Sequence, residues 1–234
     1  MKSFALIGVC CALLAGCMSY RLSSYGEGGR MVAEKAVQGR YRIVGVQIDC
    51  ARGLDEATRA RMDNPWAADP WSILQVAAGL KNTDVISAIR ERTPGVCEDV
   101  NAVPVEIKVI STMENSELGA TFLVPYLVSL GTLPAFIRRL SDCRIEVAIG
   151  SGEKRRTYSC QRRFVADSKM TCFTPIGLID YDRDFVAIEQ QLGTLGGVGN
   201  ASTAMPIRMK FQGVFAGTVA KFLGYAISSY EEGK

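Results

Sequence analysis

Apolar and polar residues alternate strictly along the segment 103–111, VPVEIKVIS. Val103, Val105, Ile107 and Val109 occupy every second position, and the residues between them are proline, glutamate and lysine. Because successive side chains of a strand point to opposite faces of a sheet, this pattern predicts a half-buried β-strand. The β-branched segment RYRIVGVQIDC, residues 40–50, predicts an earlier strand.

A helical pattern lies between these two strands, in residues 82–95. Val85, Ile86 and Ile89 fall on one face of a helix, and the Pro-Gly pair that closes the segment predicts its end. Thr83 is the predicted N-cap.

Two shorter helices are predicted from their caps. The first begins at Pro70, with Asp69 as its N-cap, and continues through SILQVAAGL. The second covers residues 182–193, with Asp182 as its N-cap and a glycine at its end.

The C-terminal segment 205–234 predicts a long helix, because apolar residues recur at helical spacing. They are Ile207, Phe211, Val214, Phe215, Val219, Phe222, Leu223 and Ile227. Lys210 and Lys221 interrupt the pattern, so we expect a helix that packs on the protein rather than one that crosses a membrane. Gly213 and Gly217 are interpreted as sites of close helix packing.

A hairpin is predicted around Ser151 and Gly152. If these two residues form the whole loop, Cys143 lies directly opposite Cys160, where a cross-strand disulfide is geometrically feasible; a longer loop would change this register. Together, these elements predict an α+β fold: a small, mostly antiparallel sheet with helices on one face and a long C-terminal helix.

Residues 118–137 form an uncharged stretch that is long enough to cross a bilayer. Pro125 and Pro134 argue against a regular membrane helix, because proline removes backbone hydrogen bonds that hydrocarbon cannot replace. The stretch is therefore interpreted as an apolar excursion between two strands that packs under the sheet, meets a partner or lies in the bilayer surface. The expected contact residues are Phe122, Leu123, Tyr126, Leu127, Leu130 and Phe136. A single transmembrane segment at 118–137 is the alternative.

The first residues, MKSFALIGVCCALLAGC, combine one lysine with an apolar region that is too short to span a membrane. The residues LLAGC, 13–17, resemble the lipobox of bacterial lipoproteins. The resemblance implies that residues 1–16 are a signal peptide and that Cys17 receives a diacylglycerol and usually an N-acyl chain such as palmitate. Met18 stands where many lipoproteins of the inner membrane carry aspartate, so the resemblance favours the periplasmic face of the outer membrane over the inner membrane.

Residues 17–39 are rich in glycine and serine and are expected to form a flexible tether behind the lipidated cysteine. Residues 40–234 then form a single periplasmic domain. An oxidising compartment favours disulfides for the remaining cysteines, Cys50, Cys97, Cys143, Cys160 and Cys172, whose spacing fits no compact metal site.

Composition argues against catalysis and nucleic-acid binding. The chain contains no histidine, which excludes Ser-His and Cys-His catalysis, and its net charge of +3 is small and scattered. The acidic run DYDRD, 180–184, lacks the glycine and the glutamate that a calcium loop requires. No cofactor or metal is expected. We therefore expect a non-enzymatic envelope lipoprotein that acts in binding or assembly, with the bilayer and an envelope protein complex as its partners.

Overall fold

The computed structural model describes residues 17–26, 39–50, 56, 72–118, 135–171, 186–188 and 201–233. Its elements are β1 (Cys17–Tyr25), β2 (Tyr41–Asp49), α3 (Ile73–Gly79), α4 (Asn82–Arg90), β3 (Val103–Leu118), β4 (Ala135–Ile149), the 3-10 turn Gly152–Lys154, β5 (Arg156–Thr171), β6 (Val186–Ile188) and α7 (Ala201–Glu232).

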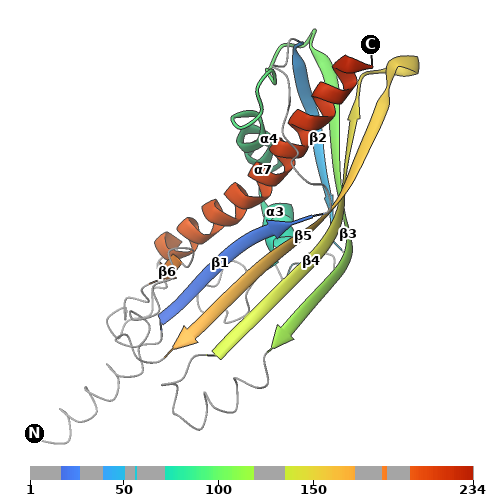
Figure 1. Ribbon diagram of the computed structural model, residues 1–234. Coiled ribbons are helices and arrows are strands. Elements are labelled where there is room, and N and C mark those ends of the chain that lie inside the picture. Colours follow the sequence, from blue (N-terminus) through green and yellow to red (C-terminus); the bar gives the residue numbers. More distant parts are fainter. Residues whose placement is uncertain are drawn as a thin grey trace, which may run out of the picture.

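The strands form one sheet in the order β2-β3-β4-β5-β1-β6. Only β2 and β3 run parallel, and every other neighbouring pair is antiparallel. Helices α3, α4 and α7 lie on one face of this sheet (Figure 1) and share a single hydrophobic core with its inward-facing residues. The predicted α+β architecture with a long C-terminal helix is therefore confirmed.

Strands β2 and β1, on either side of the three long strands β3, β4 and β5, flank different halves of them. β2 pairs with residues 103–110 of β3, whereas β1 pairs with residues 163–171 of β5. The ladders of β2–β3 and β3–β4 each contain one extra residue, Val44 and Thr112, at which the register shifts. Each bulge changes which of the following residues face the helices.

Helix α7 supplies the largest share of the helical side of the core. Phe215, Val219, Phe222, Leu223 and Ile227 are buried, as the apolar periodicity predicted. The interpretation of Gly213 and Gly217 as close-packing sites is wrong, because a Cβ atom at either position would meet nothing within 4 Å.

The start of α3 differs from the prediction. The helix begins at Ile73, and its N-cap is Ser72 rather than Asp69. The Ser72 hydroxyl accepts a hydrogen bond from the backbone amide of Gln75 at 3.1 Å. In return, the backbone amide of Ser72 donates to the side-chain oxygen of Gln75 at 3.3 Å. This reciprocal pair is a capping box, which satisfies two donors that a helix start leaves open.

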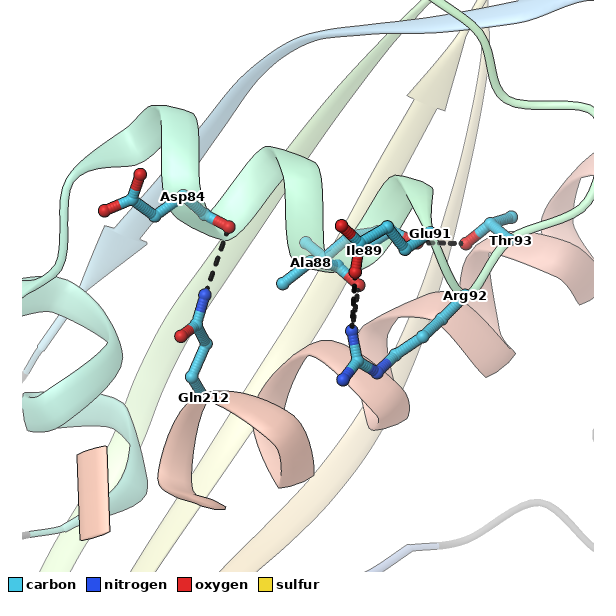
Figure 2. A network of polar contacts seen from close by, with 7 residues as sticks. All are labelled: Asp84, Ala88, Ile89, Glu91, Arg92, Thr93 and Gln212. Atoms are coloured by element: carbon cyan, nitrogen blue, oxygen red, sulfur yellow. Dashed lines mark hydrogen bonds and ion pairs between the residues drawn. The ribbon is translucent and has the colours of Figure 1, made fainter. Parts of the chain in front are cut away.

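Helix α4 has the predicted apolar face, but its N-cap is Lys81, without a side-chain cap, and Thr83 lies inside the helix. At the other end, Arg92 Nη1 and Thr93 Oγ1 donate to the carbonyl oxygens of Ala88 and Ile89 at 2.7 and 2.9 Å (Figure 2). These side-chain bonds cap the C-terminal end of the helix, where the Ile89 carbonyl also accepts from the Arg92 backbone amide at 3.1 Å.

Polar contacts near both ends of α7 hold this helix against the rest of the domain. The Gln212 side chain of α7 donates to the Asp84 carbonyl at 3.1 Å, which joins α7 to the first turn of α4 (Figure 2). At the other end of α7, Glu231 accepts hydrogen bonds from the Gly39 amide and the Tyr41 hydroxyl at 2.8 and 2.9 Å. The long helix is therefore tied to both α4 and β2.

Two other predictions fail. The predicted helix 182–193 contains strand β6, and the rest of that segment lies outside the described residues. The predicted two-residue loop between β4 and β5 spans residues 150–155, because Ile149 pairs with Arg156. Gly150 turns the chain there with a φ of 92°, a conformation that favours glycine.

Candidate functional site

Cys17, the predicted lipidation residue, is the first residue of strand β1. It pairs with Thr171 at the end of β5, and the pairing continues without interruption to Tyr25 and Arg163. The prediction of a flexible tether is therefore wrong for residues 17–25, which are part of the sheet. Residues 27–38 lie outside the described residues.

The ends of three more strand segments meet beside Cys17. Met18 pairs with Met170 of β5, and Met170 in turn pairs with Ala135, the first residue of β4. Neighbouring strands lie about 4.8 Å apart, so β1 and β4 are separated by about 10 Å at this level. β3 ends here as well, because Leu118 pairs with Ile137. We call this edge, formed by Cys17, Leu118, Ala135 and Thr171, the Cys17 end of the sheet; in Figure 1 it is the lower end, where β5 and β3 finish and β1 and β4 begin.

The predicted excursion 118–137 is shorter than expected. Leu118 is the last residue of β3 and residues 135–137 begin β4, so the connection proper is 119–134. Of the six predicted contact residues, Phe136 lies in β4 opposite Lys169. Phe122, Leu123, Tyr126, Leu127 and Leu130 lie outside the described residues.

Two arginine–carboxylate pairs join β4 to β5 above this end, on the face without helices. Arg138 Nε lies 2.6 Å from Asp167 Oδ1, and Arg163 Nε lies 2.6 Å from Asp142 Oδ1; in both pairs a second nitrogen contacts the other carboxylate oxygen. The hydrogen bond from Arg163 holds the pKa of Asp142 below its usual value. Neither pair follows from the predicted two-residue loop, which implies a different register of β4 and β5.

Cys50, Cys97, Cys143 and Cys160 are free thiols, and three of them, Cys50, Cys143 and Cys160, are not activated as nucleophiles. In the actual register Cys143 faces Arg162 and Cys160 faces Ile145, so the direct opposition behind the predicted disulfide is wrong. Burial is the largest of the causes that raise the pKa of the Cys143 thiol to about 12, and the charges of the nearby Cys160 and Asp142 raise it further. Burial likewise raises the pKa of Cys50 to about 12 and also raises that of Cys160. These thiols are protonated at neutral pH, whereas a nucleophilic cysteine is a thiolate.

An open hollow of about 490 Å³ lies beside the β2 bulge, lined by strand residues and by Asn82 at the start of α4. Charged and amide side chains line it, including Gln47, Asn82, Glu106, Lys108 and Arg155. Arg155 pairs with Glu106 at 2.7 Å, and Lys108 pairs with Asp49 at 3.3 Å. The lining charges therefore neutralise one another, and the hollow presents neither a nucleophile nor a surplus of one charge.

No metal site was found within the described residues, where no three histidine, cysteine, aspartate or glutamate side chains are grouped. The segment 180–184 lies outside them. In the part of the chain that the structure describes, no helix combines the length and the apolar character that a membrane crossing requires. Comparison with protein-family models and with curated proteins found no match for this chain.

Proposed function

We propose that the protein is a membrane-anchored envelope lipoprotein, a non-enzymatic binding or assembly module that faces the periplasm. The observation that carries the proposal is the position of Cys17, at the first residue of a strand that is paired with β5 along its whole length. Acyl chains on this residue would hold the folded domain directly against the bilayer. The lipobox resemblance and Met18 favour the outer membrane.

The chemistry of the chain supports a binding role over an enzymatic one. The sequence has no histidine to act as a general base, and three of the described thiols have raised pKa values. The apolar face of α7 is used inside the domain, where Phe215, Phe222 and Leu223 are fully buried. This leaves the apolar connection 119–134, rather than the long helix, as the segment of this chain that meets a partner.

The pairing of Leu118 with Ile137 argues against the transmembrane alternative. Paired residues on adjacent strands have Cα atoms about 5 Å apart, whereas a single crossing would separate its two ends by about 30 Å of hydrocarbon. The connection therefore leaves and re-enters the sheet on the same side of the bilayer.

The test is to follow acylation and membrane partitioning of the full chain and of Cys17→Ser, the latter exported through a cleavable non-lipoprotein signal. We expect the wild type to incorporate labelled palmitate and to fractionate with outer membranes. The variant should incorporate none and should be released when membranes are treated with carbonate. A wild-type protein without label would refute the lipoprotein assignment, and a variant that resists carbonate would favour the transmembrane alternative.

A further inference from the structure

We propose that the domain binds one buried water molecule beside the β3 bulge, held between the hydroxyls of Ser111 on β3 and Ser141 on β4. This inference goes beyond the proposed function, because the site lies between the sheet and its helices and does not depend on the lipid anchor. The ligand is an uncharged molecule that both donates and accepts hydrogen bonds.

The first observation is that both hydroxyls are buried and unpaired. The Oγ atoms of Ser111 and Ser141 are shielded from solvent, and within the described part of the chain neither has a hydrogen-bond partner. Ser141 as a whole is only 1% exposed. The other buried polar side chains among the described residues, Ser72, Thr93 and Thr218, all make hydrogen bonds. Because buried polar groups nearly always have a partner, two neighbouring unpaired hydroxyls indicate a bound molecule.

The second observation is the register of the two strands, which brings these side chains to one face. Ser111 lies directly opposite Cys143, whereas Ser141 lies two residues from Cys143 on β4 and opposite Glu114. Paired residues, and residues two apart on one strand, share a face of the sheet. Cys143 belongs to the core that the sheet shares with the helices. Both hydroxyls therefore point toward the helices.

The separation of the two serines suits one bridging water. They are diagonal neighbours, and diagonal positions are about 7–8 Å apart, with the β-carbons somewhat closer. A water that bonds two oxygens spans up to about 5.6 Å, because each O–H···O bond is about 2.8 Å long. Two hydroxyls that lean toward each other across this diagonal can therefore share a single water.

The bulge and the thiol beside it supply further hydrogen-bonding groups. The extra residue at Thr112 interrupts the ladder of β3 and β4 and leaves backbone groups unpaired. Figure 1 shows β3 bending between its two halves. The Cys143 thiol, 2% exposed, is a weak donor and acceptor in the same row. These groups can provide the third hydrogen bond that a buried water commonly makes.

The third observation is that both strands change from apolar to hydroxyl side chains at the same level. On β3 the inward apolar series ends at Val109 and Ser111 follows; on β4 the series that starts at Ile149 ends at Cys143, and Ser141 follows. Apolar side chains at these two positions would leave no group unpaired. Two serines instead make a polar site in an otherwise apolar core, as a bound water requires.

The experiment counts internal waters in the Cys17→Ser protein and in serine-to-alanine variants of it. Magnetic relaxation dispersion of oxygen-17 and deuterium measures how many waters stay inside a protein far longer than surface waters do. We expect Ser111→Ala and Ser141→Ala each to hold one such water fewer than the parent. The matched control is Ser159→Ala, which makes the same change at an exposed position of β5 and should keep the parent's number.

Urea unfolding of the same proteins gives a second readout. Ser111→Ala and Ser141→Ala should each lower the folding equilibrium constant by about 3- to 10-fold, because the remaining hydroxyl loses its bridged partner. The variant that carries both changes should fold about as well as either single variant, since the first change already releases the water. Ser159→Ala should unfold like the parent.

An equal number of long-lived waters in the parent and in both inner variants would overturn the inference, and so would losses of stability that simply add in the double variant. A gain of stability on Ser141→Ala would also overturn it, because a dry site improves when an apolar group replaces an unpaired hydroxyl. Stability of the parent, but not of the double variant, that changes with the identity of the salt at constant ionic strength would show a bound ion in place of water. That result too would overturn the inference. Ser111 is partly exposed, so Ser111→Ala still decides the question if Ser141→Ala does not fold.

Discussion

Ser72 and Glu114 are joined by a hydrogen bond of 3.3 Å between the cap of helix α3 and the far half of strand β3. The other carboxylate oxygen of Glu114 accepts from the Gln75 side chain at 3.1 Å, so one glutamate holds both members of the capping box. The β3 bulge makes this possible. Ser111 and Cys143 are paired, as are Glu114 and Ser141, and the extra residue at Thr112 turns Glu114 toward the helices.

Replacing Glu114 by alanine should therefore destabilise the domain. The change removes the acceptor for a buried serine hydroxyl and for a glutamine amide, and a loss of this kind costs about 1–3 kcal/mol of unfolding free energy. Urea unfolding of the Cys17→Ser protein measures the effect. The control is Glu106→Ala, which removes an exposed ion pair with Arg155 and should cost less than about 1 kcal/mol. Equal losses in both variants would contradict the role of Glu114 in holding α3.

Much of the fold was predictable, because its helices and first strands bury one face with a regular period. Val105, Ile107 and Val109 are buried as their alternation predicted, and the buried face of α7 followed from its periodicity. The capping box of α3 is also visible in the sequence, because Ser72 and Gln75 stand three residues apart, as this motif requires. The predicted start at Pro70 rested instead on Asp69 and Pro70, a start signal that lies three residues earlier.

Three features of the Cys17 end were not predicted, for different reasons. The glycine and serine content of residues 17–39 predicts a tether, although Met18, Tyr20 and Leu22 in strand β1 do occupy alternate positions. The far half of β3, STMENSEL, is mostly polar and shows no apolar period. The bulge cannot be recognised from the hydrophobic pattern, because one extra residue looks only like an interruption of the alternation. The alignment of the start of β1 with the start of β4 across β5 depends on long-range pairing, which no local signal encodes.

The β4–β5 register predicts which cysteine pairs can be cross-linked. Cys143 and Cys160 are diagonal neighbours, and diagonal positions are about 7–8 Å apart, beyond the reach of an unstrained disulfide. Ile145 lies directly opposite Cys160, so Ile145→Cys should form a disulfide with Cys160 under mild oxidation while Cys143 remains a thiol. Peptide mapping by mass spectrometry identifies the pair. A bond between Cys143 and Cys160 in this variant would instead support the shorter loop.

The Asp142–Arg163 pair should stabilise the domain at neutral pH and lose its effect in acid. Because the pKa of Asp142 is lowered in the folded state, its contribution is fully present above the ordinary carboxyl value of about 4 and is lost as the pH falls through the folded value. Both side chains are partly exposed, so Asp142→Asn should cost only about 0.2–1 kcal/mol at pH 7.

Urea unfolding of wild type and Asp142→Asn at several pH values tests this dependence. The difference between the two proteins should shrink steadily from pH 5 to the lowest pH at which both remain folded. A difference that stays constant over this range would show that the pair does not carry the effect.

Strand β1 should protect its amides from hydrogen exchange, in contrast to a flexible tether. Residues 17–25 are paired with β5 along their whole length, and residues 18–20 are also paired with β6. Hydrogen exchange of the Cys17→Ser protein, followed by mass spectrometry, should show slow exchange in a peptide that covers residues 18–25. The exposed turn 151–155 provides the fast reference in the same sample. If residues 18–25 exchange as fast as the turn, they form a flexible tether after all, and the domain is then free to stand away from its anchor. Protection would mean instead that any lipid on Cys17 is attached to the sheet itself, so the position of the domain over the membrane is set by the fold.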